Sequence, residues 1–271
     1  MIATYRGQAY SFHVKLHLAA ALLLAGFASL APAQAPRELE YEPVPFQAGK
    51  DVVWVPTPQV VVDKMLDLAK VTPADFVIDL GSGDGRTVIT AARRGARALG
   101  VEYNPDMVEL SKRNAVKNGV ADKVRFIKAD LFETDFSQAT VVTMFLLPEI
   151  NLKLRPKILA LAPGTRIVSN SFNMGDWEAD DSVDLGSRAD CTVSWCTALF
   201  WIVPAQVAGI YDLPQGRLVL QQQYQRLSGS LVTPGGIQAV QGGRVAGTEV
   251  IFTAGGREYR GRMNGKQLEL R

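Results

Sequence analysis

The chain is organised around Phe76-Val-Ile-Asp-Leu-Gly-Ser-Gly-Asp-Gly-Arg86, where a short apolar run ends in an acid and then breaks into alternating glycines. The run from Phe76 to Ile78 is apolar throughout, which is typical of a parallel strand buried on both faces. The residues from Thr87 to Arg94 then predict a helix. Glycines let the backbone approach a ligand closely, and a helix N-terminus offers unpaired N–H groups. The stretch therefore predicts a strand, a turn and a helix that cradle a cofactor.

The glycine spacing indicates which kind of cofactor is bound. A nicotinamide fingerprint requires Gly-x-Gly-x-x-Gly, whereas Arg86 stands where that pattern has its last glycine. The loop fits Asp-x-Gly-x-Gly-x-Gly instead. A nicotinamide-dependent oxidoreductase stays open as an alternative, but Arg86 disfavours it.

Two further acids each follow a predicted strand, later in the chain than the glycine loop. The strand at 98–101 ends in Glu102, whose carboxylate is suited to accept hydrogen bonds from both hydroxyls of a ribose. The strand at 124–128 leads to Asp130, an acid placed to accept from the exocyclic amine of adenine. Between them, Asn104 is predicted to cap a helix whose first residue is Pro105.

Together these motifs resemble those of the class I S-adenosylmethionine-dependent methyltransferases, over about residues 50 to 204. The resemblance implies an α/β fold, with a Rossmann-like, doubly wound and mostly parallel sheet. A narrower resemblance, to the branch that includes the mitochondrial protein-lysine methyltransferases, rests on Trp54-Val-Pro-Thr-Pro58, the glycine loop and Phe145-Leu-Leu-Pro148. The branch implies a protein lysine as methyl acceptor.

The resemblance also implies S-adenosylmethionine as the cofactor and assigns residues to it. The candidate cofactor-binding residues are Asp79, Gly81, Ser82, Gly83, Gly85, Glu102, Tyr103, Asp130, Leu131 and Thr57. Thr57 is included, with Trp54 and Pro56, because the family closes this segment over the methionine end of the cofactor. Thr57 is also expected to cap a helix that begins at Pro58.

The acceptor side is expected after the strand predicted at 140–147, because ligands of open α/β sheets lie beyond the carboxyl ends of the strands. The candidate acceptor-side residues are Leu147, Pro148, Glu149 and Asn151. Many class I enzymes that act on amines carry Asn-Pro-Pro-Tyr here, and its absence disfavours an adenine or glutamine N-methyltransferase. The residues identify no catalytic base, so an acceptor lysine would have to arrive neutral.

Residues 1–35 have the form of a signal peptide, with basic residues ahead of an Ala/Leu-rich run and an Ala-x-Ala site ending at Ala33. An uncleaved membrane anchor is the alternative, although the apolar run is shorter than the roughly 20 residues of a spanning helix. The chain is therefore expected to be exported, periplasmic or anchored at the membrane. Export conflicts with a cofactor that is made in the cytoplasm, so an exported, non-catalytic binding module also stays open.

Charge and residue usage exclude several classes of site. Removing Arg6 and Lys15 with the leader takes the 29 basic residues to 27, equal to the 27 acidic ones, so nothing indicates nucleic acid. Membrane contact is expected only through the N-terminal segment, and the oligomeric state is open. Both histidines, His13 and His17, lie in the leader, so no His-containing metal site or Ser-His-Asp triad is expected.

The remaining chain divides by composition. The predicted parts are a leader at 1–35, an extended lead-in at 36–50, a methyltransferase domain at 51–204 and an antiparallel β-meander of about five strands at 205–271. The meander's role is left open between substrate selection, oligomerisation and stabilisation. The acidic stretch 173–181 is expected to be a solvated loop or a lip that attracts a cationic substrate. A helix is expected to begin at Pro156, and strands at 192–195 and 199–203 are expected to complete the sheet. Cys191 and Cys196 could bridge only across a tight hairpin or bend.

Overall fold

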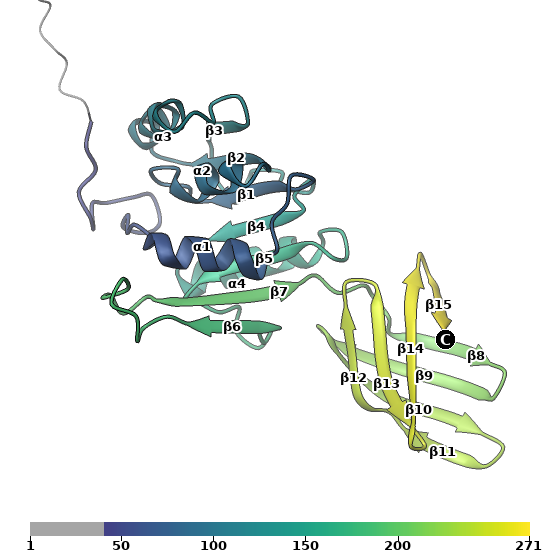
Figure 1. The fold of residues 1–271 in the computed structure, drawn as a ribbon. Coiled ribbons are helices and arrows are strands. Elements are labelled where there is room, and N and C mark those ends of the chain that lie inside the picture. The colour runs from purple at the N-terminus through teal and green to yellow at the C-terminus, as the bar shows by residue number, and fades with distance from the viewer. Residues whose placement is uncertain (1–40) are drawn as a thin grey trace, which may run out of the picture. The chain divides into compact units, whose positions relative to one another are not determined.

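The computed structural model describes residues 41–271, so the predicted leader and residues 36–40 of the lead-in lie outside the described residues (Figure 1). Within residues 41–271, no helix combines the length and the apolar character needed to cross a membrane.

The first sheet has seven strands in the order β3-β2-β1-β4-β5-β7-β6. The strands are β1 (Phe76–Leu80), β2 (Arg97–Glu102), β3 (Val124–Lys128), β4 (Val141–Met144), β5 (Arg166–Asn170), β6 (Asp181–Asp184) and β7 (Thr197–Ile202). Strands β1 to β5 are parallel, and β7 pairs antiparallel with both β5 and β6. This mostly parallel sheet confirms the predicted Rossmann-like α/β fold.

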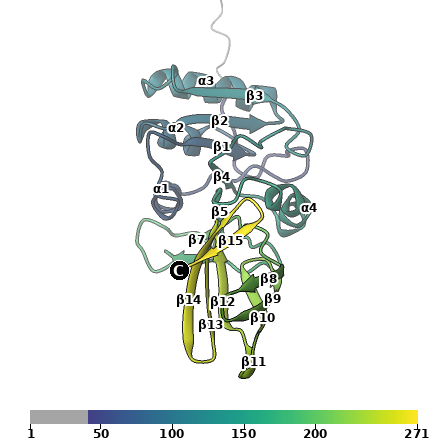
Figure 2. The same ribbon diagram turned by 90° about the vertical axis from the view of Figure 1, so that its right-hand side faces the viewer.

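Helices cover both faces of this sheet, as Figure 2 shows for α1 and α2 on one side and α4 on the other. The helices are α1 (Gln59–Leu68), α2 (Arg86–Arg93), α3 (Pro105–Lys117) and α4 (Pro148–Leu159). Side chains alternate along each strand, so Val77 joins the core under α1 and α2, whereas Ile78 joins the core under α4. This burial on both faces explains why the β1 sequence is apolar at consecutive positions.

The start of α3 is as expected. The Asn104 side chain accepts a hydrogen bond from the Asp106 N–H at 2.9 Å, and Pro105 occupies the first helical position. The start of α1 differs, because Pro58 is its N-cap and no side chain caps it. Thr57 therefore does not cap this helix. Its carbonyl instead accepts a hydrogen bond from Arg86 Nη1 at 2.8 Å.

Three elements differ from the sequence prediction in the second half of this sheet. The helix after β4 begins at Pro148 and contains Pro156, which was expected to start it. Pro148 fits the first turn because its missing N–H needs no partner there. The strand expected at 192–195 is a loop, and an unexpected strand, β6, forms within residues 181–184 because β7 supplies an antiparallel partner.

The C-terminal residues form a second sheet, antiparallel throughout, with eight strands rather than about five. The strands are β8 (Gly209–Leu213), β9 (Gly216–Gln223), β10 (Arg226–Thr233), β11 (Gly236–Ala239), β12 (Gln241–Ala246), β13 (Glu249–Ala254), β14 (Arg257–Asn264) and β15 (Gln267–Leu270). Short turns at glycines with positive φ, such as Gly247 and Gly265, allow strands of four to eight residues to follow one another closely. A separate apolar core, which includes Leu218, Leu231 and Phe252, lies within this sheet.

The acidic stretch 173–181 is a largely exposed loop that also contacts the second sheet. The Trp177 ring is buried and stacks on Tyr224 with 5.9 Å between centroids. Three of the four acids of the stretch form ion pairs with arginines: Asp176 with Arg155, Glu178 with Arg226 and Asp180 with Arg244. The predicted solvated loop is therefore confirmed for its exposed residues, and the ion pairs disfavour a lip that attracts a cation.

Candidate functional site

The glycine loop after β1 has the backbone conformation that its sequence predicts. Gly81, Gly83 and Gly85 have φ values of 78°, 54° and 83°, in the left-handed region that favours glycine. A Cβ atom on Gly83 would lie 2.6 Å from Nε1 of Trp54, so a side chain there would fill the space in front of the loop. A Cβ on Gly85 would instead meet the Phe126 ring at 2.8 Å, behind the loop.

The loop is held from behind by α3 and β2. Ser111 Oγ donates to the Gly83 carbonyl at 2.8 Å, and Asn114 Nδ2 donates to the Asp84 carbonyl at 3.0 Å. Glu102 Oε2 accepts from the Gly83 N–H, and its Oε1 accepts from the Asn104 N–H, both at 2.9 Å. Each oxygen of Glu102 keeps a further lone pair, so this fixed carboxylate can also accept from a diol.

Asp130 lies just beyond the end of β3, and its two oxygens have different partners. Oδ1 accepts from the Phe132 N–H at 2.8 Å, whereas Oδ2 forms an ion pair with Lys50. The hydrogen bond from Lys50 holds the pKa of Asp130 below its usual value. The Lys50 ammonium also lies 5.1 Å from the centroid of the Tyr103 ring. Lys50 had no signal in the sequence, because it lies 80 positions from Asp130.

Asp79 is the buried acid of the site, with 6% of its surface exposed. Burial raises its pKa to about 7, although the hydrogen bond that Thr143 Oγ1 donates at 2.6 Å opposes the increase. The negative charges of Glu102 and Asp84 raise the pKa further. A carboxyl group in this state gains most from a nearby cation, which would ionise it.

These groups surround one cavity at the carboxyl ends of β1, β2 and β4, with a volume of about 1040 Å³ that includes its open mouth. Nine of the ten candidate cofactor residues line it: Thr57, Asp79, Gly81, Ser82, Gly83, Glu102, Tyr103, Asp130 and Leu131. Gly85 does not line it and instead caps α2. The structure therefore brings together acids from three strands that were predicted separately.

The four candidate acceptor-side residues do not line this cavity. Leu147 caps α4, Pro148 and Glu149 lie in its first turn, and Leu147 and Glu149 are exposed. Asn151 is fully buried, and its Nδ2 donates to the carbonyls of Phe172 and Asn173. Strand β4 ends at Met144, earlier than expected, so the residues that reach the cavity here are Met144, Phe145, Leu146 and Ile150.

A segment that the sequence only partly indicated closes the other side of the cavity. Residues 47–57 all line it, and the segment is folded back on itself by hydrogen bonds from the Phe46 N–H to the Trp54 carbonyl and from the Trp54 N–H to the Gln47 carbonyl. We call residues 46–57 the strap. Arg86, the residue that disfavoured a nicotinamide, ties the strap to the loop by bonding both Thr57 and Asp84.

The residues present fit S-adenosylmethionine. The glycine loop leaves a space in front of Gly83 that a Cβ would fill. Carboxylates are available for the ribose, the adenine amine and the methionine ammonium. Among residues 41–271, no cluster of His, Cys, Asp and Glu could hold a metal ion.

Comparisons with known proteins agree with this site. Residues 79–181 match the family model of the ANTKMT methyltransferase domain. A protein-lysine N-methyltransferase of Saccharolobus islandicus is 46% identical over 135 residues, which are 49% of this chain and 84% of that protein. The adenine nucleotide translocase lysine N-methyltransferase of Mus musculus is 36% identical over 119 residues, and this match covers 43% of this chain and 52% of the mouse protein.

A solved structure is also similar. An RNA methyltransferase from Salinibacter ruber, in complex with S-adenosylhomocysteine, shares 50% sequence identity with a TM-score of 0.52. The match covers 56% of this chain and 96% of that one. The bound product of that relative agrees with the cofactor that the cavity fits.

Proposed function

This chain belongs to the S-adenosylmethionine-dependent methyltransferases, and we propose that its methyl acceptor is the side-chain amine of a protein lysine. Methyltransferase membership and the cofactor disfavour both alternatives, the nicotinamide-dependent oxidoreductase and the non-catalytic module. The acceptor is inferred from two supports, namely the lysine-specific names of several relatives and the charge of the cavity.

The lysine-specific names of several relatives carry the choice of acceptor. The lining of the cavity contains five acids, Asp51, Asp79, Asp84, Glu102 and Asp130, and two basic residues, Lys50 and Arg86. Both basic residues are paired with acids of the lining. Three of the five acids are assigned to the cofactor, so the lining accommodates a cationic acceptor without selecting it by charge alone.

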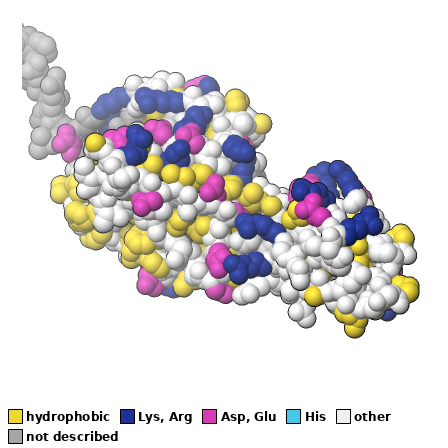
Figure 3. Space-filling view, turned by 60° about the horizontal axis from the view of Figure 1, so that its bottom comes forward, with side chains coloured by type: hydrophobic (Ala, Val, Ile, Leu, Met, Phe, Trp, Pro, Cys, Tyr) yellow, Lys and Arg dark blue, Asp and Glu magenta, His cyan; other side chains and the backbone are white. Residues whose placement is uncertain are grey.

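The charge on the surface supports the same choice. On the face drawn in Figure 3, Lys and Arg side chains are interspersed with Asp and Glu side chains. Nucleic-acid-binding proteins generally present a basic patch or stripe to the phosphates. An RNA acceptor, as in the name of the Salinibacter ruber relative, is therefore the second candidate and is separated by experiment.

The chain's own residues bind the cofactor, orient it toward the acceptor and exclude water from the site. S-adenosylmethionine supplies a methyl group on a sulfonium, which is already a good electrophile. Glu102 would hold the ribose, Asp130 the adenine amine and Asp79 the methionine ammonium. The apolar residues Met144, Phe145 and Leu146 line the other end, and such a wall lowers the pKa of an entering lysine, which favours its neutral, nucleophilic form.

The compartment is part of the proposal. We infer that the protein works outside the cytoplasm, as the leader-like residues 1–35 indicate. The Cys191–Cys196 disulfide supports this, because structural disulfides persist mainly in oxidising compartments. The proposed location is tested by fusing to the C-terminus a reporter that is active on only one side of the membrane. A C-terminus found in the cytoplasm would contradict export.

The acceptor class is tested by transfer of a tritiated methyl group. Purified residues 36–271 are incubated with labelled S-adenosylmethionine and an extract of source cells, and the label is followed into protein and RNA fractions. We expect label in protein that acid hydrolysis releases as methylated lysine. Label confined to RNA would refute a lysine acceptor while leaving the methyltransferase activity intact.

A further inference from the structure

Four aromatic rings gather beside the cavity, at the carboxyl ends of β4 and β5. Phe145 and Phe172 stack with 5.8 Å between centroids, and Trp195 lies 6.5 Å from Phe145. Phe46 of the strap meets Trp195 edge-on at 6.4 Å. We call these four residues the aromatic cluster. They come from four separate segments of the chain, so their meeting is a product of the fold.

One member of the aromatic cluster, Phe145, lines the cavity at the end where the acceptor should enter. Asp130 follows β3, Glu102 ends β2 and Asp79 lies in β1, and these strands are neighbours in that order. Adenine, ribose and methionine would therefore be held in the same order across the sheet. Strand β4 comes next, and Phe145, which directly follows it, lines the cavity.

The rings of the aromatic cluster are not fully buried. Phe145, Phe172 and Trp195 are each half-buried, and Phe46 is 62% exposed. Large apolar rings that remain partly accessible beside a cavity are unlike the fully buried Trp177 and Trp201 of the adjacent core. The accessible parts of these rings can contact a ligand that is both apolar and cationic.

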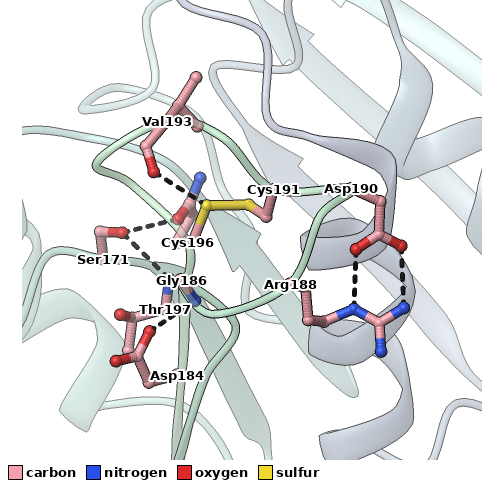
Figure 4. The surroundings of a disulfide bond; sticks show 10 residues. Ser171, Asp184, Gly186, Arg188, Asp190, Cys191, Val193, Cys196 and Thr197 are labelled. Carbon is pink, nitrogen blue, oxygen red and sulfur yellow. Dashed lines mark hydrogen bonds and ion pairs between the residues drawn. A yellow bond between two sulfur atoms is a disulfide. The ribbon is translucent and has the colours of Figure 1, made fainter.

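A disulfide holds Trp195 in the aromatic cluster. Trp195 immediately precedes Cys196, which is bonded to Cys191 in the loop between β6 and β7 (Figure 4). The loop is further fixed by the Leu185 N–H, which donates to the Cys196 carbonyl at 2.7 Å, and by the Thr197 N–H, which donates to Ser171 Oγ at 3.4 Å. The disulfide and these hydrogen bonds therefore hold the chain on the C-terminal side of Trp195, at Cys196 and Thr197.

We propose that the aromatic cluster binds the methylene chain and ammonium of the acceptor lysine, and that the Cys191–Cys196 disulfide keeps Trp195 in place for this. The inference rests on the proposed lysine acceptor. Aromatic faces attract an ammonium and cover methylene groups at the same time, so they select lysine from other polar side chains. Aromatic rings also stack on nucleobases, but the acidic lining disfavours that ligand.

The first test compares Trp195→Ala, Trp195→Leu and Trp195→Phe with the wild type. The probes are a short peptide with a single lysine and the same peptide with trimethyl-lysine. Calorimetry measures binding of S-adenosylhomocysteine and of the trimethyl-lysine peptide, and methyl transfer to the unmodified peptide gives KM and kcat. Circular dichroism verifies the fold of each variant.

We expect Trp195→Ala and Trp195→Leu to weaken peptide binding and raise its KM by about 10-fold. Binding of S-adenosylhomocysteine should change less than twofold, and Trp195→Phe should restore most of the loss because it retains an aromatic face. Peptide binding that is unchanged in Trp195→Ala and Trp195→Leu would overturn the inference, even if the wild type methylates lysine. Absence of lysine methylation with intact cofactor binding would overturn the proposed function instead.

The second test removes the disulfide. Reduction of the wild type by dithiothreitol should raise the peptide KM about as far as the Cys191→Ala/Cys196→Ala variant does, with cofactor binding retained. The double variant is the matched control, because dithiothreitol should not change it further. A peptide KM that reduction leaves unchanged would overturn the role of the disulfide.

Discussion

Replacing Glu102 with alanine should separate cofactor binding from folding. The Glu102 carboxylate accepts the Gly83 and Asn104 N–H groups at 2.9 Å each, and would accept the ribose hydroxyls. A hydrogen bond to a charged group contributes about 1.5–3 kcal/mol. Loss of one such bond to the ribose weakens binding by roughly 10- to 150-fold, since about 1.4 kcal/mol is tenfold. We therefore expect S-adenosylhomocysteine to bind Glu102→Ala about 100-fold more weakly in calorimetry.

The same substitution should also lower the stability of the fold. It removes the acceptor of two partly buried N–H groups, so the free energy of unfolding should fall by about 1–3 kcal/mol. Glu109→Ala is the matched control, because Glu109 is an exposed residue of α3 that is paired with Lys112. We expect it to change neither quantity measurably. Glu102→Ala protein that is folded and binds S-adenosylhomocysteine within threefold of wild type would refute the placement of the ribose at Glu102.

Three further predictions concern the same cavity. The pKa of Asp79 is raised from 3.8 to about 7 in the folded protein, so its burial destabilises the fold progressively as pH rises from about 4 to 7, by about 4 kcal/mol at most. Asp79→Asn should remove this loss of stability, and urea unfolding of both proteins between about pH 4 and 7 would detect the change. Unfolding free energies that depend on pH in the same way for the wild type and the variant would contradict this prediction. Gly83→Ala should abolish binding of S-adenosylhomocysteine, because the φ of 54° at Gly83 and the contact of a new Cβ with Trp54 both oppose a side chain. Calorimetry on the double variant Gly83→Ala/Trp54→Ala should show partial recovery of binding. A double variant without any recovery would contradict the clash between residue 83 and Trp54. The Lys50→Ala variant should bind S-adenosylhomocysteine more tightly than the wild type, because the ion pair between Asp130 and Lys50 no longer has to be broken. Added salt should reduce the difference in affinity between the two proteins. Weaker binding by the variant would instead indicate that Lys50 contacts the cofactor.

Sequence reasoning identified the parts of the site that depend on neighbours along the chain. The glycine loop requires left-handed backbone at Gly81 and Gly83, a conformation that favours glycine for local steric reasons. Glu102 and Asp130 follow strands, and parallel strands bring their carboxyl ends to one edge of the sheet. The cap at Asn104 is likewise local chemistry.

The acceptor side could not be predicted in the same way. The end of β4 depends on how long β1 and β5 pair with it, and this pairing stops at Met144. The chain therefore leaves the sheet at Phe145, and the predicted acceptor-side residues lie at the start of α4 without lining the cavity, whereas Ile150 of that helix does line it. The predicted end of β4 was wrong by three residues, from Leu147 to Met144, so different side chains line this part of the cavity from those predicted.

From the order of residues alone, the strand, glycine turn and helix that cradle a cofactor and the acids that follow the strands could be derived, because each arises from backbone geometry or from strand ends that a short stretch specifies. The identity of the cofactor and the mostly parallel sheet came from the resemblance that these motifs carry. The Lys50–Asp130 pair, the ion pairs of the acidic stretch with Arg226 and Arg244, and the meeting of Phe46 with Trp195 could not be derived. Each of these contacts joins segments tens of residues apart. Their partners are chosen by packing of the completed fold, which no local pattern in the chain records.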